Sequence, residues 1–205
     1  MVSNAQGLKG APSSDRLIYL HGFRSSPQSF KARWLANAMN GLGRGTQFLC
    51  PQLPASPRDA VELVRREFDL QPSDTLVGSS LGGYYATYLA ERFGCRAVLL
   101  NPAIHPARDL KSMVGPQTQF HSDAAFEFRR EYLEELQDLD IGGVTFTKRY
   151  FLIAAKGDEL LDWREMVGRY RGARQLVLDG SDHGLSDFAE YGHAVLEFAG
   201  FLVPV

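Results

Sequence analysis

Residues 76–84 read LVGSSLGGY, an apolar run that passes into a glycine-rich turn. The apolar side is typical of a buried strand, and residues 84–93 are rich in Ala, Leu and Tyr, as is common in helices. Between them only one register satisfies G-x-S-x-G: Gly78 and Gly82 flank Ser80. A sharp strand-to-helix turn leaves no room for side chains at these two positions. The stretch therefore predicts a turn that presents the Ser80 hydroxyl at a helix N-terminus, where negative charge is favoured.

The length and composition are those of an ordinary globular protein. The chain has 205 residues, 44% of them hydrophobic and 22% charged, which predicts one domain with a sizeable core. A net charge of −2 argues against a nucleic-acid binder that works through bulk charge. Cys50 and Cys95 lie far apart in or beside apolar runs, which predicts buried thiols. No His/Asp/Glu cluster has ligand spacing, so we expect no metal site.

The N-terminal residues carry no targeting signal that we recognise. Residues 1–16 are small and polar without an apolar core segment, and we expect residues 1–15 to be frayed. No run in the chain approaches the length of about 18 apolar residues that a membrane span needs. We therefore predict a cytoplasmic protein without a membrane span.

Apolar strands alternate with helical patterns along the chain, which indicates an α/β fold. We expect strands in the opening stretch and at residues 17–20, 46–50, 96–100, 149–155 and 175–178. Helices are expected at residues 29–40, 58–70, 84–93, 162–170 and 184–201. This alternation predicts a single domain, residues 1–205, with a mainly parallel sheet of about six strands and helices on both faces.

Residues 101–148 interrupt the alternation between the fourth and fifth strands. We expect a helix over residues 123–139, with Phe128, Tyr132 and Leu136 on one stripe. Because insertions longer than a normal connection are commonly functional, we predict a small cap over the site. An ordinary crossover helix with long loops is the alternative.

A serine hydroxyl is a weak nucleophile, so it needs a base within hydrogen-bond reach and an acid that orients the base. Asp158 follows the fifth strand in AKGDE, residues 155–159, and His183 follows the sixth strand in DGSDHG, residues 179–184. Parallel strands bring such residues to one edge of the sheet. We therefore predict a catalytic triad of Ser80, Asp158 and His183.

Each of these assignments has a plainer alternative. Ser80 could lie in a connection without chemistry, Asp158 could be a turn residue, and His183 could cap the next helix. Glu159 and Asp162 are rivals for the acid, although both lie deeper in the following helix. The other histidines that follow Ser80 are expected to be structural or solvated, namely His105, His121 and His193.

A tetrahedral intermediate also needs two N–H donors for its oxyanion. We expect one from the backbone of Leu81, the residue after the nucleophile, and one from Phe23, in the loop after the first strand. Arg24 follows Phe23 and could pair with an acidic group of a substrate, or be a solvated surface residue. Phe23, Tyr84 and Trp163 are candidate pocket walls, although aromatic residues near strand ends are commonly core.

Taken together, these segments resemble the α/β-hydrolases, and more closely the small YqiA/YcfP-type esterases. The matching segments are YLHGF at 19–23 followed by SSPQS at 25–29, GSSLGGYYA at 78–86, NPA at 101–103, GDE at 157–159 and DH at 182–183. The resemblance implies the α/β-hydrolase fold and a serine esterase without a cofactor. It also supports Ser80, Asp158 and His183 as the triad.

The leading hypothesis is hydrolysis of a small carboxylic ester through an acyl-enzyme. A thioesterase uses the same groups, so a small thioester is the alternative substrate. A third hypothesis, from a different class, is a non-enzymatic protein of this fold that binds a ligand or partner. The oligomeric state is not predicted.

Overall fold

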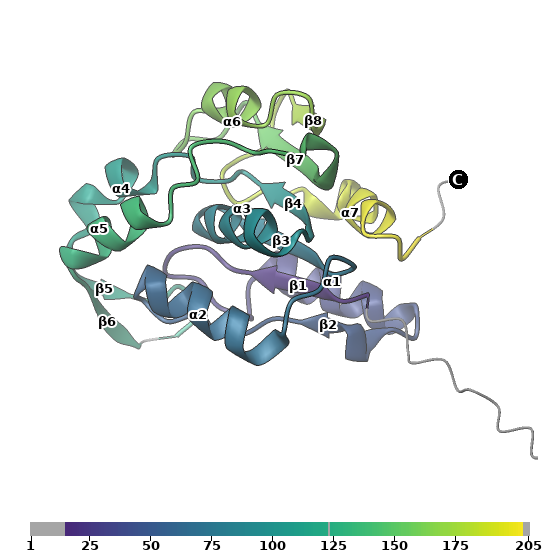
Figure 1. The fold of residues 1–205 in the computed structure, drawn as a ribbon, viewed down its shortest axis with the longest axis horizontal. Helices are drawn as coiled ribbons and strands as arrows, with labels where there is room; N and C mark the ends of the chain where they lie inside the picture. Colours follow the sequence, from purple (N-terminus) through teal and green to yellow (C-terminus); the bar gives the residue numbers. More distant parts are fainter. Residues whose placement is uncertain (1–14, 123, 203–205) are drawn as a thin grey trace, which may run out of the picture.

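Six parallel strands form the central sheet of the computed structural model (Figure 1). The structure describes residues 15–122 and 124–202, so residues 1–14, most of the expected frayed terminus, lie outside it. In spatial order the strands are β2 (Phe48–Leu49), β1 (Leu17–Leu20), β3 (Thr75–Ser79), β4 (Arg96–Leu100), β7 (Tyr150–Ala155) and β8 (Arg174–Leu178). Every neighbouring pair is parallel, which confirms the predicted fold class.

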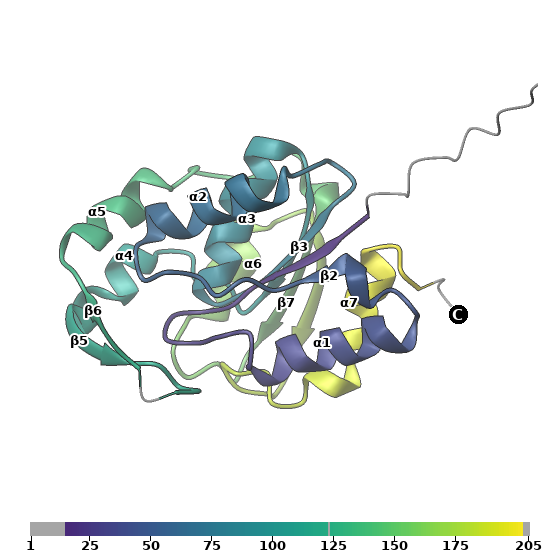
Figure 2. The ribbon, with the colours of Figure 1, turned by 90° about the horizontal axis from the view of Figure 1, so that it is seen from below.

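Helices cover both faces of this sheet because successive strand residues point to opposite sides. Ile18 and Leu20 belong to the core under α2, α3 and α6, whereas Leu17 and Tyr19 belong to the core under α1 and α7. Figure 2 shows α1 and α7 together on one side of the strands and α2, α3 and α6 on the other. The helices are α1 (Phe30–Gly41), α2 (Pro57–Phe68), α3 (Leu81–Phe93), α6 (Trp163–Arg169) and α7 (Gly192–Phe198).

The order of the strands changes direction beside β1. The chain passes from β1 to β2 on one side and then to β3 on the other side, from which the remaining strands continue outward. In open α/β sheets the crevice at such a switch point, at the carboxyl ends of the strands, is where ligands bind. Here it lies between the loops that follow β1 and β3, the loops of Phe23 and Ser80.

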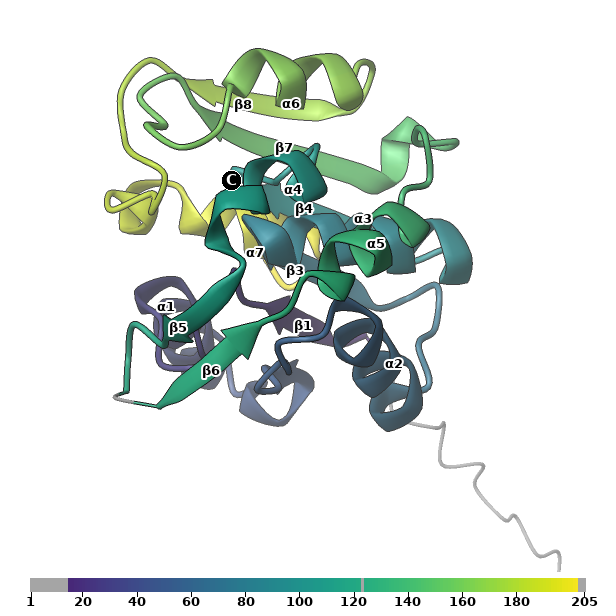
Figure 3. The same cartoon turned by 90° about the vertical axis from the view of Figure 1, so that its left-hand side faces the viewer.

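The segment between β4 and β7 forms a layer of its own at one end of the sheet. In Figure 3 its small two-stranded sheet and its helices face the viewer, in front of the main sheet. Its elements are α4 (Pro106–Asp109), the 3-10 helix η2 (Lys111–Met113), β5 (Gly115–Thr118), β6 (Ala125–Phe128), α5 (Glu131–Asp138) and the 3-10 helix η3 (Thr147–Arg149).

The prediction of a single helix over residues 123–139 is therefore wrong for the first half of that range. Residues 125–128 pair antiparallel with residues 115–118, and α5 begins only at Glu131. Residues 125–128 read AFEF, an alternation with period two, and Phe128 is buried while Ala125 and Glu127 are exposed. The predicted stripe mixed this strand with the following helix.

Two other boundaries differ from expectation. The second strand is shorter than residues 46–50, because a 3-10 helix, η1 (Gly45–Gln47), precedes the two residues of β2, an edge strand that pairs only with β1. The expected closing helix over residues 184–201 is divided into a 3-10 helix, η4 (Phe188–Glu190), and α7. Gly192 begins α7 where a Cβ would lie 2.6 Å from the Trp34 ring.

The two glycines around Ser80 are required by the close approach of three backbone segments. A Cβ on Gly78 would lie 2.2 Å from the carbonyl oxygen of Gly82, and one on Gly82 would lie 2.0 Å from that of Leu20. Real Cβ atoms do not approach backbone so closely, so β3 and α3 can meet at this angle only with glycine at both positions.

We predict that Gly82→Ala destabilises the protein by about 2 kcal/mol or more, because α3 must move away from β1. The measurement is urea unfolding of the variant beside Gly143→Ala, a position where a Cβ would meet no atom within 4 Å. The control is expected within about 0.5 kcal/mol of wild type. Equal urea midpoints for the two variants would contradict the inference that position 82 has no room for a Cβ.

Candidate active site

Ser80 lies at the junction of β3 and α3 in a left-handed backbone conformation, with a φ of 54°. Its N–H donates to the carbonyl oxygen of Leu100 at 3.0 Å, and its own carbonyl accepts the N–H of Ala103 at 3.0 Å. Both partners belong to the end of β4 and the residues that follow it. The serine backbone is therefore held by the neighbouring strand as well as by its own turn.

The side chains of Ser80, His183 and Asp158 form one continuous hydrogen-bonded chain. His183 Nε2 lies 3.0 Å from Ser80 Oγ, and His183 Nδ1 lies 2.8 Å from Asp158 Oδ2 and 3.0 Å from Oδ1. An ionised carboxylate only accepts hydrogen bonds, so the Nδ1 atom carries the proton in this arrangement. The Nε2 atom is then free to accept the proton of the serine hydroxyl.

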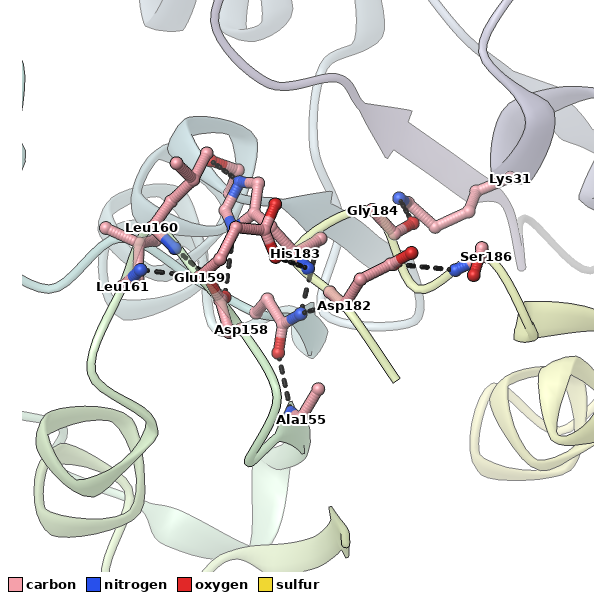
Figure 4. Close-up of polar contacts among 12 residues, drawn as sticks. Lys31, Ala155, Asp158, Glu159, Leu160, Leu161, Asp182, His183, Gly184 and Ser186 are labelled. Carbon is pink, nitrogen blue, oxygen red and sulfur yellow. Dashed lines mark hydrogen bonds and ion pairs between the residues drawn. The ribbon is translucent and has the colours of Figure 1, made fainter. Parts of the chain in front are cut away.

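The carboxylate of Asp158 is fixed by its own loop. Its side chain is fully buried, and Oδ1 accepts the N–H groups of Leu160 and Leu161, both at 2.9 Å (Figure 4). The two rivals for the acid have other partners: Glu159 accepts the backbone N–H of His183, and Asp162 caps α6 by accepting the N–H of Arg164. Among the three acids, only Asp158 touches the imidazole.

Asn101 is a site residue that the sequence did not single out beyond the NPA segment. It is completely buried and has a φ of 42°. Its Nδ2 donates to the carbonyl oxygens of Asp182 and His183 at 3.0 and 3.2 Å, and its Oδ1 accepts the N–H of Ala155 at 2.8 Å. One side chain thus joins the end of β7 to the histidine loop.

Lys31 of α1 is the second group that the sequence did not reveal. It is 8% exposed, and its Nζ donates to the carbonyl oxygen of Gly184 (Figure 4). Burial lowers the pKa of the Lys31 ammonium to about 8, although the nearby Asp182 favours the charged form. Three consecutive carbonyl groups, those of residues 182–184, therefore have buried side-chain donors.

Strained backbone is concentrated in these loops. Of the described non-glycine residues with a positive φ, all but Asp69 lie at the carboxyl edge of the sheet. They are Arg24, Ser80, Asn101, Ser181 and Leu185. Such conformations cost on the order of 1 kcal/mol each and persist only where surrounding contacts enforce them, which is common at functional sites.

The loop after β1 packs directly against the serine. A Cβ on Gly22 would lie 3.2 Å from Ser80 Cβ and from the carbonyl oxygen of Ser79, a tight contact that glycine avoids. His21 Nε2 accepts the N–H of Leu53 at 3.0 Å, and burial lowers the pKa of this imidazole. His21 thus holds the loop after β1 against the residues around Leu53.

A cavity of about 440 Å³ opens over the serine. Ser80 and His183 line it, as do Phe23 and Leu81, the residues from which we expect the oxyanion donors. The remaining wall comes largely from residues 103–120 and from Leu160 and Leu161, and it is mostly apolar. The nucleophile candidate therefore faces a mainly apolar cavity that a small organic molecule can enter.

Residues 16–200 match the family described as "Uncharacterised protein family (UPF0227)". The chain belongs to this family. Similar solved structures include alpha/beta hydrolase domain-containing protein 10 from mouse, with 16% identity, a TM-score of 0.69 and coverage of 94% of this chain and 90% of that one. Est1E from Butyrivibrio proteoclasticus, solved with ferulic acid, has 13% identity, a TM-score of 0.64 and coverage of 93% and 90%. An esterase from Pyrococcus furiosus has 17% identity, a TM-score of 0.60 and coverage of 94% and 84%.

These similarities show that this UPF0227 chain has the α/β-hydrolase fold, and they confirm the resemblance inferred from the sequence. In the described residues, no group of three or more His, Cys, Asp and Glu side chains is arranged to hold a metal ion. No helix in residues 15–122 or 124–202 has both the length and the apolar character needed to cross a bilayer.

Arg24 lines the cavity of this UPF0227 protein, but its side chain contacts residues of the β5–β6 hairpin. Its Nε donates to the carbonyl oxygen of Thr118 at 2.7 Å, and its guanidinium stacks 4.5 Å from the centre of the Phe120 ring. The carbonyl oxygen of Arg24 accepts the N–H of Phe120 at 2.8 Å. Arg24 therefore attaches the β5–β6 hairpin to the loop after β1, and a contact with substrate stays a prediction.

Tyr84 and Trp163 are not among the residues that line the cavity over Ser80, and a contact of either with substrate stays a prediction. Tyr84 is buried, and its hydroxyl donates to the carbonyl oxygen of Leu136 on α5 at 2.6 Å. Trp163 begins α6, where Lys156 and Arg164 lie over its ring. Both side chains pack structural elements together.

The remaining histidines lie apart from the triad. His105 and His193 are exposed, and His193 packs edge-on against Trp34. His121 is also exposed and lies 3.2 Å from the Ser26 hydroxyl through its Nδ1. None of the three contacts Ser80 or Asp158, as expected.

The buried Lys31 predicts a pH dependence of stability. Its pKa in the folded protein, about 8, lies below the ordinary value of 10.5, so between these values the unfolded chain binds more protons and stability rises with pH. The gain is up to about 1.4 kcal/mol per pH unit. Between pH 7.5 and 9.5 we therefore expect the free energy of unfolding of the wild type to rise by about 1 to 2 kcal/mol more than that of Lys31→Met.

Urea unfolding at each pH measures this difference. Lys148→Met, at an exposed lysine, is the matched control and should keep the wild-type dependence. Parallel curves for wild type and Lys31→Met would show that Lys31 does not titrate in this range.

Proposed function

We propose that this protein is a serine hydrolase that cleaves small carboxylic esters through an acyl-enzyme. The observation that carries the proposal is the unbroken chain of hydrogen bonds from Ser80 Oγ through His183 to Asp158. It ends at the mainly apolar cavity, which lets an ester carbonyl approach the hydroxyl. The esterases among the structures with the same fold support this reaction class.

In the first half-reaction Ser80 Oγ attacks the ester carbonyl while His183 Nε2 removes the hydroxyl proton. Asp158 holds the imidazole in the required tautomer and stabilises its positive charge. The carbonyl oxygen becomes an oxyanion, which accepts the N–H groups of Phe23 and Leu81. His183 then gives its proton to the departing alcohol, and the acyl group stays on Ser80.

In the second half-reaction a water molecule takes the place of the alcohol. His183 removes a proton from this water as it attacks the acyl carbon, and the same N–H groups accept the new oxyanion. When the intermediate collapses, His183 returns the proton to Ser80 Oγ. The carboxylic acid leaves, and the enzyme is restored with no other reactant consumed.

Residues 101–148 act in this proposal as the cap of the reaction cavity. Pro106, Leu110 and Met113 belong to its wall, as does Phe120 from the hairpin connection. Arg24 links that hairpin to the loop that supplies the Phe23 N–H. The cap therefore excludes water on the side of the cavity opposite the sheet.

A thioesterase is the second candidate, because the same groups attack a thioester. Its thiolate leaving group requires less help from His183 than an alkoxide does. Competition between matched oxygen esters and thioesters of one acid measures the preference. A non-enzymatic binding protein of this fold does not need the three side chains in contact, and the contact therefore favours an enzyme.

Treatment with a fluorophosphonate tests the proposal, because an activated serine displaces fluoride and keeps the phosphonyl group. We expect mass spectrometry to locate the adduct at Ser80, and we expect labelling to fall at least a hundredfold in His183→Ala, which lacks the general base. His193→Ala, at an exposed histidine, is the matched control and should label as wild type does.

Labelling at another residue, or equal labelling of wild type and His183→Ala, would reject the serine mechanism. Far-UV circular dichroism of each variant separates loss of the base from loss of the fold.

A further inference from the structure

The guanidinium of Arg24 uses only one of its three nitrogen atoms within the protein. Its Nε donates to the carbonyl oxygen of Thr118 at 2.7 Å, and its central carbon lies 4.5 Å from the centre of the Phe120 ring. In the part of the chain that the structure describes, neither Nη atom has a hydrogen-bond or ion-pair partner. An arginine has five N–H donors, so the four on the Nη atoms remain available to a ligand.

The backbone of Arg24 is fixed as firmly as its Nε atom. Its φ of 61° lies in the left-handed region, which glycine and asparagine adopt at a lower cost than arginine does. Its carbonyl oxygen accepts the N–H of Phe120 at 2.8 Å. Because the residue is held before any ligand arrives, a ligand that binds its Nη atoms loses little affinity to the ordering of this side chain.

Arg24 belongs to the walls of two neighbouring cavities. One is the cavity over Ser80 and His183, and the other, of about 290 Å³, includes neither of these residues in its wall. Phe23, Arg24 and Leu81 line both cavities. Since Phe23 and Leu81 are the expected oxyanion donors, Arg24 is next to the position that an ester carbonyl would take.

Arg24 is the only lysine or arginine among the described residues that line these two cavities. The single acid among them is Asp109, whose Oδ1 already accepts Arg108 Nε at 2.8 Å. Burial lowers the pKa of His21, and His183 must be neutral to act as a base. Arg24 is therefore a cation without a counter-ion in mainly apolar walls, where its attraction for an anion is stronger than in water.

We propose that Arg24 binds a free carboxylate of the substrate, so that the substrates are esters with a second, unesterified carboxyl group. This inference rests on the proposed esterase function. The two Nη atoms can donate parallel hydrogen bonds to the two oxygens of one carboxylate. A single guanidinium balances one negative charge, which suits a carboxylate better than a phosphate with a charge of nearly −2.

The test uses the ethyl half-esters of succinate, glutarate and adipate, each beside its uncharged monoamide, with release of ethanol as the measurement. For at least one chain length, we expect kcat/KM of the wild type to be at least tenfold higher for the acid than for the amide. Arg24→Gln should lose this preference, and Arg24→Lys should keep part of it. Arg33→Gln, at an exposed arginine of α1, changes the net charge equally and should keep the whole preference.

A purely structural role of Arg24 predicts a different result. If Arg24 only attaches the β5–β6 hairpin to the loop after β1, Arg24→Gln lowers kcat/KM for acid and amide by the same factor. Higher ionic strength should reduce the preference of the wild type, because salt screens the attraction between guanidinium and carboxylate. An acid-to-amide ratio that Arg24→Gln leaves unchanged would overturn the proposal.

A second pair of substrates places the carboxylate on the alcohol part. These are the acetate esters of 4-hydroxybutyrate and of 4-hydroxybutyramide. Because Arg24 lines both cavities, the pair in which Arg24→Gln removes the preference identifies the part of the ester that carries the carboxylate. The absence of any preference for the acid in both sets of substrates would also overturn the proposal.

Binding without turnover separates this inference from the proposed function. In Ser80→Ala, calorimetry should show the preferred half-ester binding at least tenfold more tightly than its monoamide, and added Arg24→Gln should remove the difference. This result, together with a Ser80 that the fluorophosphonate does not label, would support the carboxylate site and reject the hydrolase. Equal affinities of half-ester and monoamide would overturn the carboxylate site even if Ser80 is labelled.

Discussion

The left-handed backbone of Ser80 is the constraint on which the rest of the site depends. It exists because β1, β3 and the first turn of α3 approach so closely that Gly78 and Gly82 have no room for a Cβ. The strain of this turn is offset by the buried sheet around it, whose residues are packed on both faces. The result is a hydroxyl that is directed away from the sheet and toward the neighbouring loops.

The imidazole that meets this hydroxyl is held by parts of the chain far from it. Asn101 at the end of β4 and Lys31 on α1 donate to the carbonyl groups of residues 182–184, and Glu159 accepts the N–H of His183. Buried polar groups of this kind stabilise only one loop conformation, because any other leaves donors or acceptors unpaired. The 3.0 Å distance between His183 Nε2 and Ser80 Oγ therefore follows from the whole carboxyl edge of the sheet.

Local sequence patterns were sufficient to predict the sheet, the serine turn and the proximity of Ser80, Asp158 and His183. The spacing of the glycines and the order of the strands can both be read directly from the sequence. Asn101 and Lys31 could not be identified in this way, since their partners are distant backbone carbonyls that leave no signature in side-chain chemistry. The surroundings of Tyr84 and Trp163 could not be predicted either, because an aromatic residue beside a strand end can face either the cavity or the core. Only the packing of α5 and the loop contacts of α6 decide between them.

The central claim is that Ser80, its base and the two backbone donors act on one carbonyl group. A crystal structure of the protein after reaction with a small fluorophosphonate tests this most directly, because the tetrahedral phosphonyl group resembles the intermediate. The account predicts phosphorus on Ser80 Oγ and a phosphonyl oxygen within hydrogen-bond distance of the N–H groups of Phe23 and Leu81. A phosphonyl oxygen turned away from both groups, or a phosphonyl group on another residue, would contradict it.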